Sequence, residues 1–300
     1  MEKYLTIDIG RTRLRYGVVT EELDILETGK EHTTSEDKMG IFEPIKNLTD
    51  RFRDEIDGVS ITMPGVIDRE RGFAYSGGMY RWVKDFPYAD ELSAYIGKPV
   101  VIANDAKGAA LAEMGYGSLK RVKNGLMLMI LNTGIGGAVV LDGHLVNGEH
   151  FASAETSYMR GDYRNRDGYD DMFALAVSVN GLIKLVEETS GLKNLNILRI
   201  MGKLHEKDEN VKKGVDIYCD MLATFIYNIQ CIIDAEVCVI AGDIIDGSFM
   251  IKMIKEAVDR KFDEDRYGNV FKPEIRESVF HNNARMYGAV YNFRQLKGKI

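Results

Sequence analysis

Both halves of the chain open on the same local pattern: a strand, a short glycine-containing turn and a second strand. The pattern occupies residues 4–19 and recurs at residues 126–141. In the first copy, residues 3–9 alternate apolar and polar side chains, as a half-buried strand does. Two copies of one strand–turn–strand unit indicate that the chain holds two related domains.

Helical patterns alternate with further strands along the rest of the chain, which predicts the α/β fold class. The helices are identified by apolar residues at a spacing of three to four. Glycines and basic residues cluster at 115–123, so we predict an N-terminal domain of residues 1–118 plus 284–300 and a C-terminal domain of residues 119–283. The further strands are expected at 59–63, 100–103 and 237–241, and the helices at 41–56, 106–114, 175–186, 217–232, 250–262 and 284–293.

The composition limits the classes of partner. The chain has 300 residues and a formal net charge of -7, and the sequence shows no basic patch, so a nucleic-acid partner is not expected. Its longest tight apolar run, 126–131, is far shorter than the roughly 20 residues that a membrane span needs. The first residues lack a signal-peptide pattern. We therefore expect a cytoplasmic protein without a membrane anchor.

The chain has three cysteines, Cys219, Cys231 and Cys238. Their number is odd and no Cys-x-x-Cys pair occurs, so neither a disulfide framework nor a four-thiolate metal site is expected. We expect three buried thiols.

The first turn, Asp8-Ile9-Gly10-Arg11-Thr12, has the residue types that suit a metal-bound phosphate. Backbone N–H groups of a tight turn and the Thr12 hydroxyl can donate hydrogen bonds to phosphate oxygens. The Asp8 carboxylate would face the cation, directly or through water. A polar hairpin turn without a ligand is the alternative interpretation.

The second turn, Asn132-Thr133-Gly134-Ile135-Gly136-Gly137, has three glycines in four positions. Glycine lets the backbone approach a ligand closely and adopt positive φ angles, so a second phosphate loop is predicted. A tight β-hairpin without a ligand is again the alternative.

Two further motifs lie at the ends of apolar strands. In α/β folds, ligands bind at the carboxyl ends of the strands. Asn104 and Asp105 precede a helix. Asp105 can accept the proton of a substrate hydroxyl while Asn104 orients the same substrate. The alternative is that Asp105 simply caps the helix. Ala241-Gly242-Asp243 ends a later strand. Gly242 leaves space for a nucleotide base or ribose, or makes a plain strand-to-helix turn.

The order of these motifs resembles the sugar kinase, heat-shock ATPase and actin superfamily. The similarity is greatest to the ROK family of repressors, unknown reading frames and sugar kinases, and it covers nearly the whole chain. It implies an actin-like (ribonuclease H-like) fold of two domains with an interdomain cleft. The segments that carry the resemblance are Asp8 to Gly17, Pro64-Gly65-Val66-Ile67-Asp68, Asn104-Asp105-Ala106 with Ala109-Ala110 and Ala112-Glu113, Thr133 to Gly137, Ala241-Gly242 and Gly288-Ala289.

The resemblance also implies residue roles, with Asp105 as the catalytic base of a kinase. The sugar-binding residues that it implies are Gly65, Asn104, Asp105, Glu155, Tyr158 and Asp171. The residues implied for ATP are Asp8, Gly10, Thr12, Arg13, Thr133, Gly134, Gly136 and Gly242. Mg²⁺ would be held near Asp8 and Asp105, directly or through water.

The sequence departs from the ROK pattern where that family carries a zinc site. Tyr158 replaces the zinc-binding histidine, and residues 161–169 contain no cysteine where the family has Cys-x-Cys-Gly-x-x-Gly-Cys. Aspartates are poor substitutes for Cys and His in a tetrahedral zinc site, so we predict a member without zinc. Arg11, Arg13 and Asn132 replace the Gly, Lys and Gly of the family's two phosphate loops.

The predicted reaction is transfer of the γ-phosphoryl group of ATP to a hexose, at its 6-hydroxyl. Glucose, fructose, N-acetylmannosamine and β-glucosides are all candidate acceptors. A catalytically silent sugar sensor is the alternative, motivated by Tyr158 and Asn132. A transcriptional repressor is not expected, because a first strand at residue 4 leaves no room before it for a helix-turn-helix domain. A homodimer is an open expectation, since proteins of the resembling family are often dimers.

Overall fold

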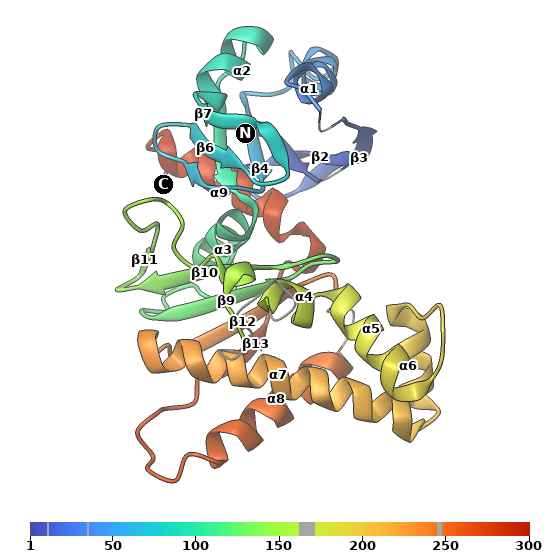
Figure 1. Ribbon diagram of the computed structural model, residues 1–300. Coiled ribbons are helices and arrows are strands. Elements are labelled where there is room, and N and C mark those ends of the chain that lie inside the picture. Colours follow the sequence, from blue (N-terminus) through green and yellow to red (C-terminus); the bar gives the residue numbers. More distant parts are fainter. Residues whose placement is uncertain (11, 35, 162–171, 245–247) are drawn as a thin grey trace. The chain divides into compact units, whose positions relative to one another are not determined.

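The computed structural model describes residues 1–10, 12–34, 36–161, 172–244 and 248–300. These residues form two compact units (Figure 1). The limits predicted above for two domains stay a prediction. The first unit consists of Met1–Lys120, Asn147–Ser153 and Asn283–Ile300, and the second of Arg121–Val146 and Ala154–Asn282.

The first unit contains eight strands and four helices among its described residues. They are β1 (Lys3–Ile9), β2 (Arg13–Thr20), β3 (Ile25–His32), α1 (Met39–Arg51), β4 (Gly58–Met63), β5 (Ile67–Asp68), β6 (Phe73–Gly77), β7 (Tyr80–Phe86), α2 (Tyr88–Ile96), β8 (Val100–Asn104), α3 (Asp105–Tyr116) and α9 (Ala284–Leu296).

The main sheet of the first unit has the strand order β3-β2-β1-β4-β8, and β5, β6 and β7 form a small sheet beside it. The strands β1 and β2 are an antiparallel hairpin, whereas β4 and β8 join the sheet in parallel. Successive residues of β1 point to opposite faces of the sheet and pack into different hydrophobic cores. Leu5 and Ile7 pack with α1 and α2, and Tyr4 packs with Phe293 of α9. Because helices cover both faces, β4 and β8 are buried along their whole length.

The second unit repeats this plan. Its sheet has the order β11-β10-β9-β12-β13, again an antiparallel hairpin followed by two parallel strands. Figure 1 shows α7 lying along this sheet, and α8 packs against α7. The shared topology of the two sheets confirms the duplication predicted from the sequence. The elements are β9 (Gly125–Ile130), β10 (Ile135–Leu141), β11 (His144–Leu145), α4 (Phe173–Val177), α5 (Val179–Ser190), α6 (Ile197–His205), α7 (Glu209–Ile233), β12 (Val237–Gly242), α8 (Ser248–Asp263) and β13 (Glu274–Glu277).

Some predicted elements differ from those observed. The helix expected at 175–186 is broken at Ser178, because this side chain accepts a hydrogen bond from the Gly181 N–H (3.1 Å) and caps a new helix, α5. The turn expected at 132–137 is shorter, because β10 already begins at Ile135. Cys231 is exposed rather than buried, whereas Cys219 and Cys238 are buried thiols.

None of the described helices is both long enough and apolar enough to cross a bilayer.

The helices α3 and α9 touch through glycines. A Cβ atom built on Gly288 would lie 1.7 Å from the carbonyl oxygen of Gly108, so the two backbones are in direct contact. Asn292 of α9 is fully buried and donates a hydrogen bond to the Ile102 carbonyl of β8 (3.3 Å). These contacts hold α9 against both α3 and β8.

We predict that Gly288→Ala lowers the free energy of unfolding by about 1–3 kcal/mol, because its methyl group must push α3 and α9 apart. Thermal unfolding followed by circular dichroism measures the loss. Gly202→Ala is the matched control, since a Cβ at this helical glycine meets no atom within 4 Å. Equal stability of the two variants would contradict the close helix contact.

Candidate active site

Two carboxylates lie at the same edge of the first sheet. Asp8 is near the end of β1, and the strand register places it opposite Thr62 of β4. Thr62 in turn lies opposite Ala103 of β8, two residues before Asp105. The carboxyl ends of parallel strands meet at one edge of a sheet, which is where α/β folds place their ligands. Strand pairing therefore brings together two residues that lie almost 100 positions apart in the sequence.

Asp8 forms an ion pair with Arg285 of α9, with 3.1 Å between Oδ2 and Nη1. Its Oδ1 lies 3.3 Å from the Thr62 hydroxyl, which donates a hydrogen bond. The pair is shielded from water, since Asp8 is only 5% exposed. The sequence analysis missed Arg285; its one signal was a basic residue three positions before Gly288 in the last motif.

The two carboxylates and Arg285 influence one another electrostatically. Burial raises the pKa of Asp105, and the Arg285 guanidinium opposes that rise. Burial also raises the pKa of Asp8, which Arg285 again opposes and the negative charge of Asp105 adds to. A carboxylate with a raised pKa holds a proton more readily, as a general base must.

Asn104, not Asp105, caps helix α3. The Asn104 Oδ1 accepts a hydrogen bond from the Lys107 N–H (3.1 Å), and its Nδ2 donates one to the Gly65 carbonyl (3.0 Å). Asn104 is therefore the N-cap residue of α3, and the Asp105 Oδ1 accepts a hydrogen bond from the Ala106 N–H (2.8 Å) in the first turn. Gly65 has φ of +117°, and a Cβ there would lie 2.0 Å from the Ser76 carbonyl oxygen, so this position requires glycine.

The first turn is held by internal hydrogen bonds. The Gly10 N–H donates to the Arg13 carbonyl (3.0 Å), and the Gly10 carbonyl accepts from the Tyr80 hydroxyl. Burial raises the pKa of Tyr80 to about 12, so this hydroxyl keeps its proton. The Gly10 N–H is thus engaged in the hairpin, whereas the side chains of Thr12 and Arg13 are exposed and free to reach a ligand.

The second turn is fastened to the end of β12. The backbone N–H and the side-chain Nδ2 of Asn132 both donate to Asp243 Oδ2, at 3.2 and 2.9 Å. Gly242 has φ of +107°, and a Cβ there would lie 2.0 Å from the Ile130 carbonyl oxygen. Asn132, which stands where the resembling family has glycine, therefore connects the turn to the Gly242-Asp243 segment by hydrogen bonds. No motif in the sequence indicated this interaction.

The glycines of the second turn do not have the positive φ angles that we expected. Gly134, Gly136 and Gly137 all keep negative φ, because the strand geometry of β10 continues through most of this segment. Gly137 instead provides space: a Cβ there would lie 2.5 Å from the Ala154 carbonyl oxygen.

Thr133 is exposed, and no described residue forms a hydrogen bond with its hydroxyl. It borders a pocket of about 560 Å³ in the second unit, between the turn and the helices α5 and α7. Apolar side chains such as Leu185 and Met221 line the pocket together with Ser178 and Asn180. The turn thus places the Thr133 hydroxyl, which forms no hydrogen bond with the described residues, beside a pocket.

The predicted sugar-binding residues of the second unit lie near the second turn. Glu155 is half-buried and precedes a short 3₁₀ turn, Thr156–Tyr158. The Ser157 hydroxyl in this turn donates to the Ile135 carbonyl (2.7 Å), which joins it to the glycine turn. Tyr158 is 67% exposed. Asp171 lies outside the described residues.

No group of three or more His, Cys, Asp or Glu side chains suited to a metal ion occurs within the described ranges. The aspartates at 162, 167, 170 and 171 fall outside those ranges.

Known proteins resemble this chain over its whole length. The chain is 27% identical to the beta-glucoside kinase of Klebsiella pneumoniae over 98% of this chain and 97% of that protein. It is 28% identical to the beta-glucoside kinase of Listeria monocytogenes over 98% of each. A crystal structure of a ROK family protein from Streptococcus pneumoniae in complex with sucrose matches with a TM-score of 0.84, at 25% identity, over 99% of this chain and 100% of that one.

These matches confirm the actin-like fold and the predicted class of enzyme, a phosphotransferase with an alcohol group as acceptor. The sequence model of the ROK family matches residues 4–295. The chain therefore belongs to the ROK family.

Proposed function

We propose that the chain is an ATP-dependent sugar kinase that transfers the γ-phosphoryl group of ATP to a hexose hydroxyl, with Asp105 as the base. One observation carries the proposal: Asp105 lies at the ligand-binding edge of the first sheet, beside a second carboxylate that Arg285 holds. Its neighbour Asn104 is the N-cap residue of α3, and the Ala106 N–H bonds to Oδ1 of Asp105, so Oδ2 is the oxygen that we assign to the sugar hydroxyl.

In the proposed reaction, the sugar hydroxyl loses its proton to Asp105 while its oxygen bonds to the γ-phosphorus. The bond from that phosphorus to the bridging oxygen breaks, and ADP leaves. Phosphoryl transfer needs mainly positioning and neutralisation of charge, with little covalent work by the protein. Burial raises the pKa of Asp105, so its carboxylate accepts a proton more readily than an exposed aspartate does.

The carboxylates also fit a Mg²⁺ ion, which prefers oxygen ligands and retains several waters. Both oxygens of Asp8 are already engaged, one by Arg285 and one by Thr62, so Asp8 would hold the ion through water. When bound, Mg²⁺ would neutralise the phosphate charge. Asp105 would be the second residue near the Mg²⁺ ion.

The nucleotide would use the exposed polar groups of the two turns. Thr12 and Arg13 are exposed in the first unit, and Arg13 supplies a positive charge for phosphate. In the second unit, the Thr133 hydroxyl is unused by described residues, and the pocket beside it offers space for part of the nucleotide. Gly134, Gly136 and Gly242 keep this segment free of bulky side chains.

Among the candidate acceptors, a β-glucoside has direct support from the names of the two kinases compared above. Glu155 and Tyr158 would contact the sugar.

A catalytically silent sensor is the second candidate, favoured by the exposed Tyr158 at the position of the family's histidine. A coupled assay for ADP over glucose, fructose, N-acetylmannosamine and a β-glucoside distinguishes the two, because a sensor binds sugar without forming ADP.

We predict that Asp105→Asn lowers kcat by about 10²–10⁴-fold while sugar binding is kept, because the amide cannot accept the proton. The coupled ADP assay gives kcat, and calorimetry gives the sugar Kd. Asp54→Asn, at an exposed carboxylate with the same charge change, is the control and should keep full activity. Near-normal turnover of Asp105→Asn would remove Asp105 from the mechanism.

We predict that Arg285→Met lowers the free energy of unfolding by about 3–5 kcal/mol, because it leaves the buried Asp8 carboxylate without its cation. Adding Asp8→Asn should recover part of this loss. Urea denaturation followed by fluorescence reports on the first unit, since the only tryptophan is Trp82. Lys212→Met, which breaks an exposed pair with Asp216, should cost no more than about 1 kcal/mol. Additive effects of the Asp8 and Arg285 substitutions would refute the coupling.

We predict that the purified protein contains no stoichiometric zinc, because the cysteine ligands of the family's site are absent from residues 161–169. Elemental analysis by mass spectrometry measures the zinc content per chain. One zinc per chain after dialysis against a chelator would show that the prediction is wrong.

A further inference from the structure

One buried side chain joins the first turn of the chain to the small sheet of β5, β6 and β7. Tyr80 is the first residue of β7, and its hydroxyl donates a hydrogen bond to the Gly10 carbonyl in the turn. The two residues lie 70 positions apart in the sequence. No motif included Tyr80, because a bond from a side chain to a distant backbone carbonyl leaves no local pattern.

The Tyr80 ring is held on two sides. It is only 1% exposed and belongs to the hydrophobic core that α1 and α2 form with the first sheet. In the small sheet, Tyr80 pairs with Gly77 of β6, and a Cβ atom on Gly77 would lie 3.1 Å from the Tyr80 Cβ. Close packing of this kind leaves a side chain little freedom. The hydroxyl therefore offers its hydrogen bond from a fixed place.

The strand beside Tyr80 is bonded to the loop that begins at Pro64. The Val66 N–H donates a hydrogen bond to the Ser76 carbonyl of β6 (3.1 Å). The preceding residue, Gly65, accepts a hydrogen bond from the Asn104 side chain (3.0 Å). The loop is thus attached at one end to the neighbour of Asp105 and at the other to the hairpin that carries Tyr80.

Two backbone hydrogen bonds also hold the first turn. The Gly10 N–H donates to the Arg13 carbonyl (3.0 Å), and the Thr33 N–H donates to the Thr12 carbonyl (3.1 Å). Arg13 begins β2, and Thr33 directly follows β3. These bonds attach the turn to the strands of its own sheet, whereas the bond from Tyr80 attaches it to the small sheet.

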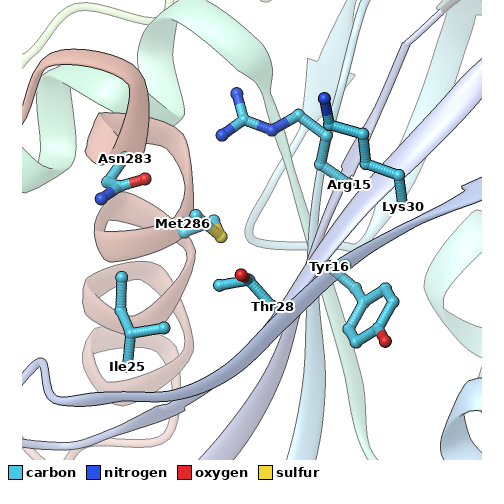
Figure 2. A pocket seen from close by; sticks show the side chains of 8 residues that line it. Arg15, Tyr16, Ile25, Thr28, Lys30, Asn283 and Met286 are labelled. Carbon is cyan, nitrogen blue, oxygen red and sulfur yellow. The ribbon is translucent and has the colours of Figure 1, made fainter.

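The other face of the β2–β3 hairpin is incompletely packed. A pocket of about 340 Å³ lies between this hairpin and the start of α9, and Figure 2 shows Ile25, Thr28 and Met286 around it. Packing on the α9 side therefore leaves space beside the strands that lead from the turn. The bond from Tyr80, whose ring lies in the core on the α1 and α2 side, gives the turn a fixed point on the opposite face.

We propose that Tyr80 is a positioning residue that couples the first turn to the Gly65 loop, so that a sugar bound at the loop helps to place the turn for the phosphates of ATP. The proposal rests on the function proposed above and on the sugar-binding role that the family resemblance implies for Gly65. A bound sugar restricts the motion of the loop, and the Tyr80 hydroxyl passes this restriction to the Gly10 carbonyl. By linkage, the nucleotide strengthens sugar binding by the same factor.

Tyr80→Phe tests the coupling, because it keeps the buried ring and removes only the hydroxyl. Calorimetry of the full chain measures the Kd of the non-hydrolysable analogue AMPPNP with Mg²⁺, with and without whichever of the four candidate sugars the wild type binds. We expect the sugar to lower this Kd by about fivefold or more in the wild type, and we expect Tyr80→Phe to lose most of that gain. The sugar Kd without nucleotide should be the same in both proteins, which a general loss of structure would not allow.

Tyr88→Phe is the matched control. Tyr88 belongs to the same core and is fully buried, and its hydroxyl forms no hydrogen bond within the part of the chain that the structure describes. Loss of this hydroxyl should leave both Kd values and the coupling unchanged. Wild-type coupling in Tyr80→Phe, or an equal loss of coupling in the two phenylalanine variants, would overturn the proposal.

Amide hydrogen exchange without ligands separates this proposal from the proposed kinase function. The peptide that contains Gly10 should exchange about 3–10-fold faster in Tyr80→Phe than in the wild type or Tyr88→Phe, because the turn loses one hydrogen bond. Equal exchange in all three proteins would refute the positioning role, whether or not the wild type forms ADP. Faster exchange in Tyr80→Phe alone supports that role even if the wild type forms no ADP, a result that would refute only the kinase function.

Discussion

The direct contact between α3 and α9 is the constraint on which the first unit's site depends. Gly108 and Gly288 let the two helix backbones touch. Asp105 lies three residues before Gly108, and Arg285 lies three residues before Gly288, so each is one turn from the crossing. Larger side chains at the crossing would move both helix ends. The ion pair between Arg285 and Asp8 would then lose its geometry, and Asp8 would be a buried charge without a partner.

In each unit a polar interaction with an aspartate orders a turn that the proposed function uses. In the first unit Arg285 holds Asp8 at the end of β1, and in the second unit Asp243 holds Asn132 at the end of β9. Both interactions join a strand end to a segment distant in the sequence. Asn132, at which the chain departs from its family's usual glycine, thus has a hydrogen-bond partner in a distant segment of the same unit.

Much of the fold was predictable because strands and helices have different hydrophobic periods. The strands near residues 3–9, 59–63 and 237–241 were expected, and so was the helix α7 from residue 217 onwards, although it begins at Glu209. The helices α2 and α6 and the small sheet of β5, β6 and β7 were not, since short elements carry few periods of any pattern. The break at Ser178 was also missed, because one capping hydrogen bond outweighed a continuous helical pattern.

By itself, the sequence determined the α/β class, the duplication, the family and the carboxylates at positions 8 and 105, because these depend on local periodicity and on motifs of adjacent residues. Only the tertiary structure decided that Arg285 pairs with Asp8 and that Asn132 is held by Asp243. It also decided that the Tyr80 hydroxyl donates to the Gly10 carbonyl. The physical reason is that electrostatic and hydrogen-bonding contacts act over a few ångströms in space, whatever the separation of the residues along the chain.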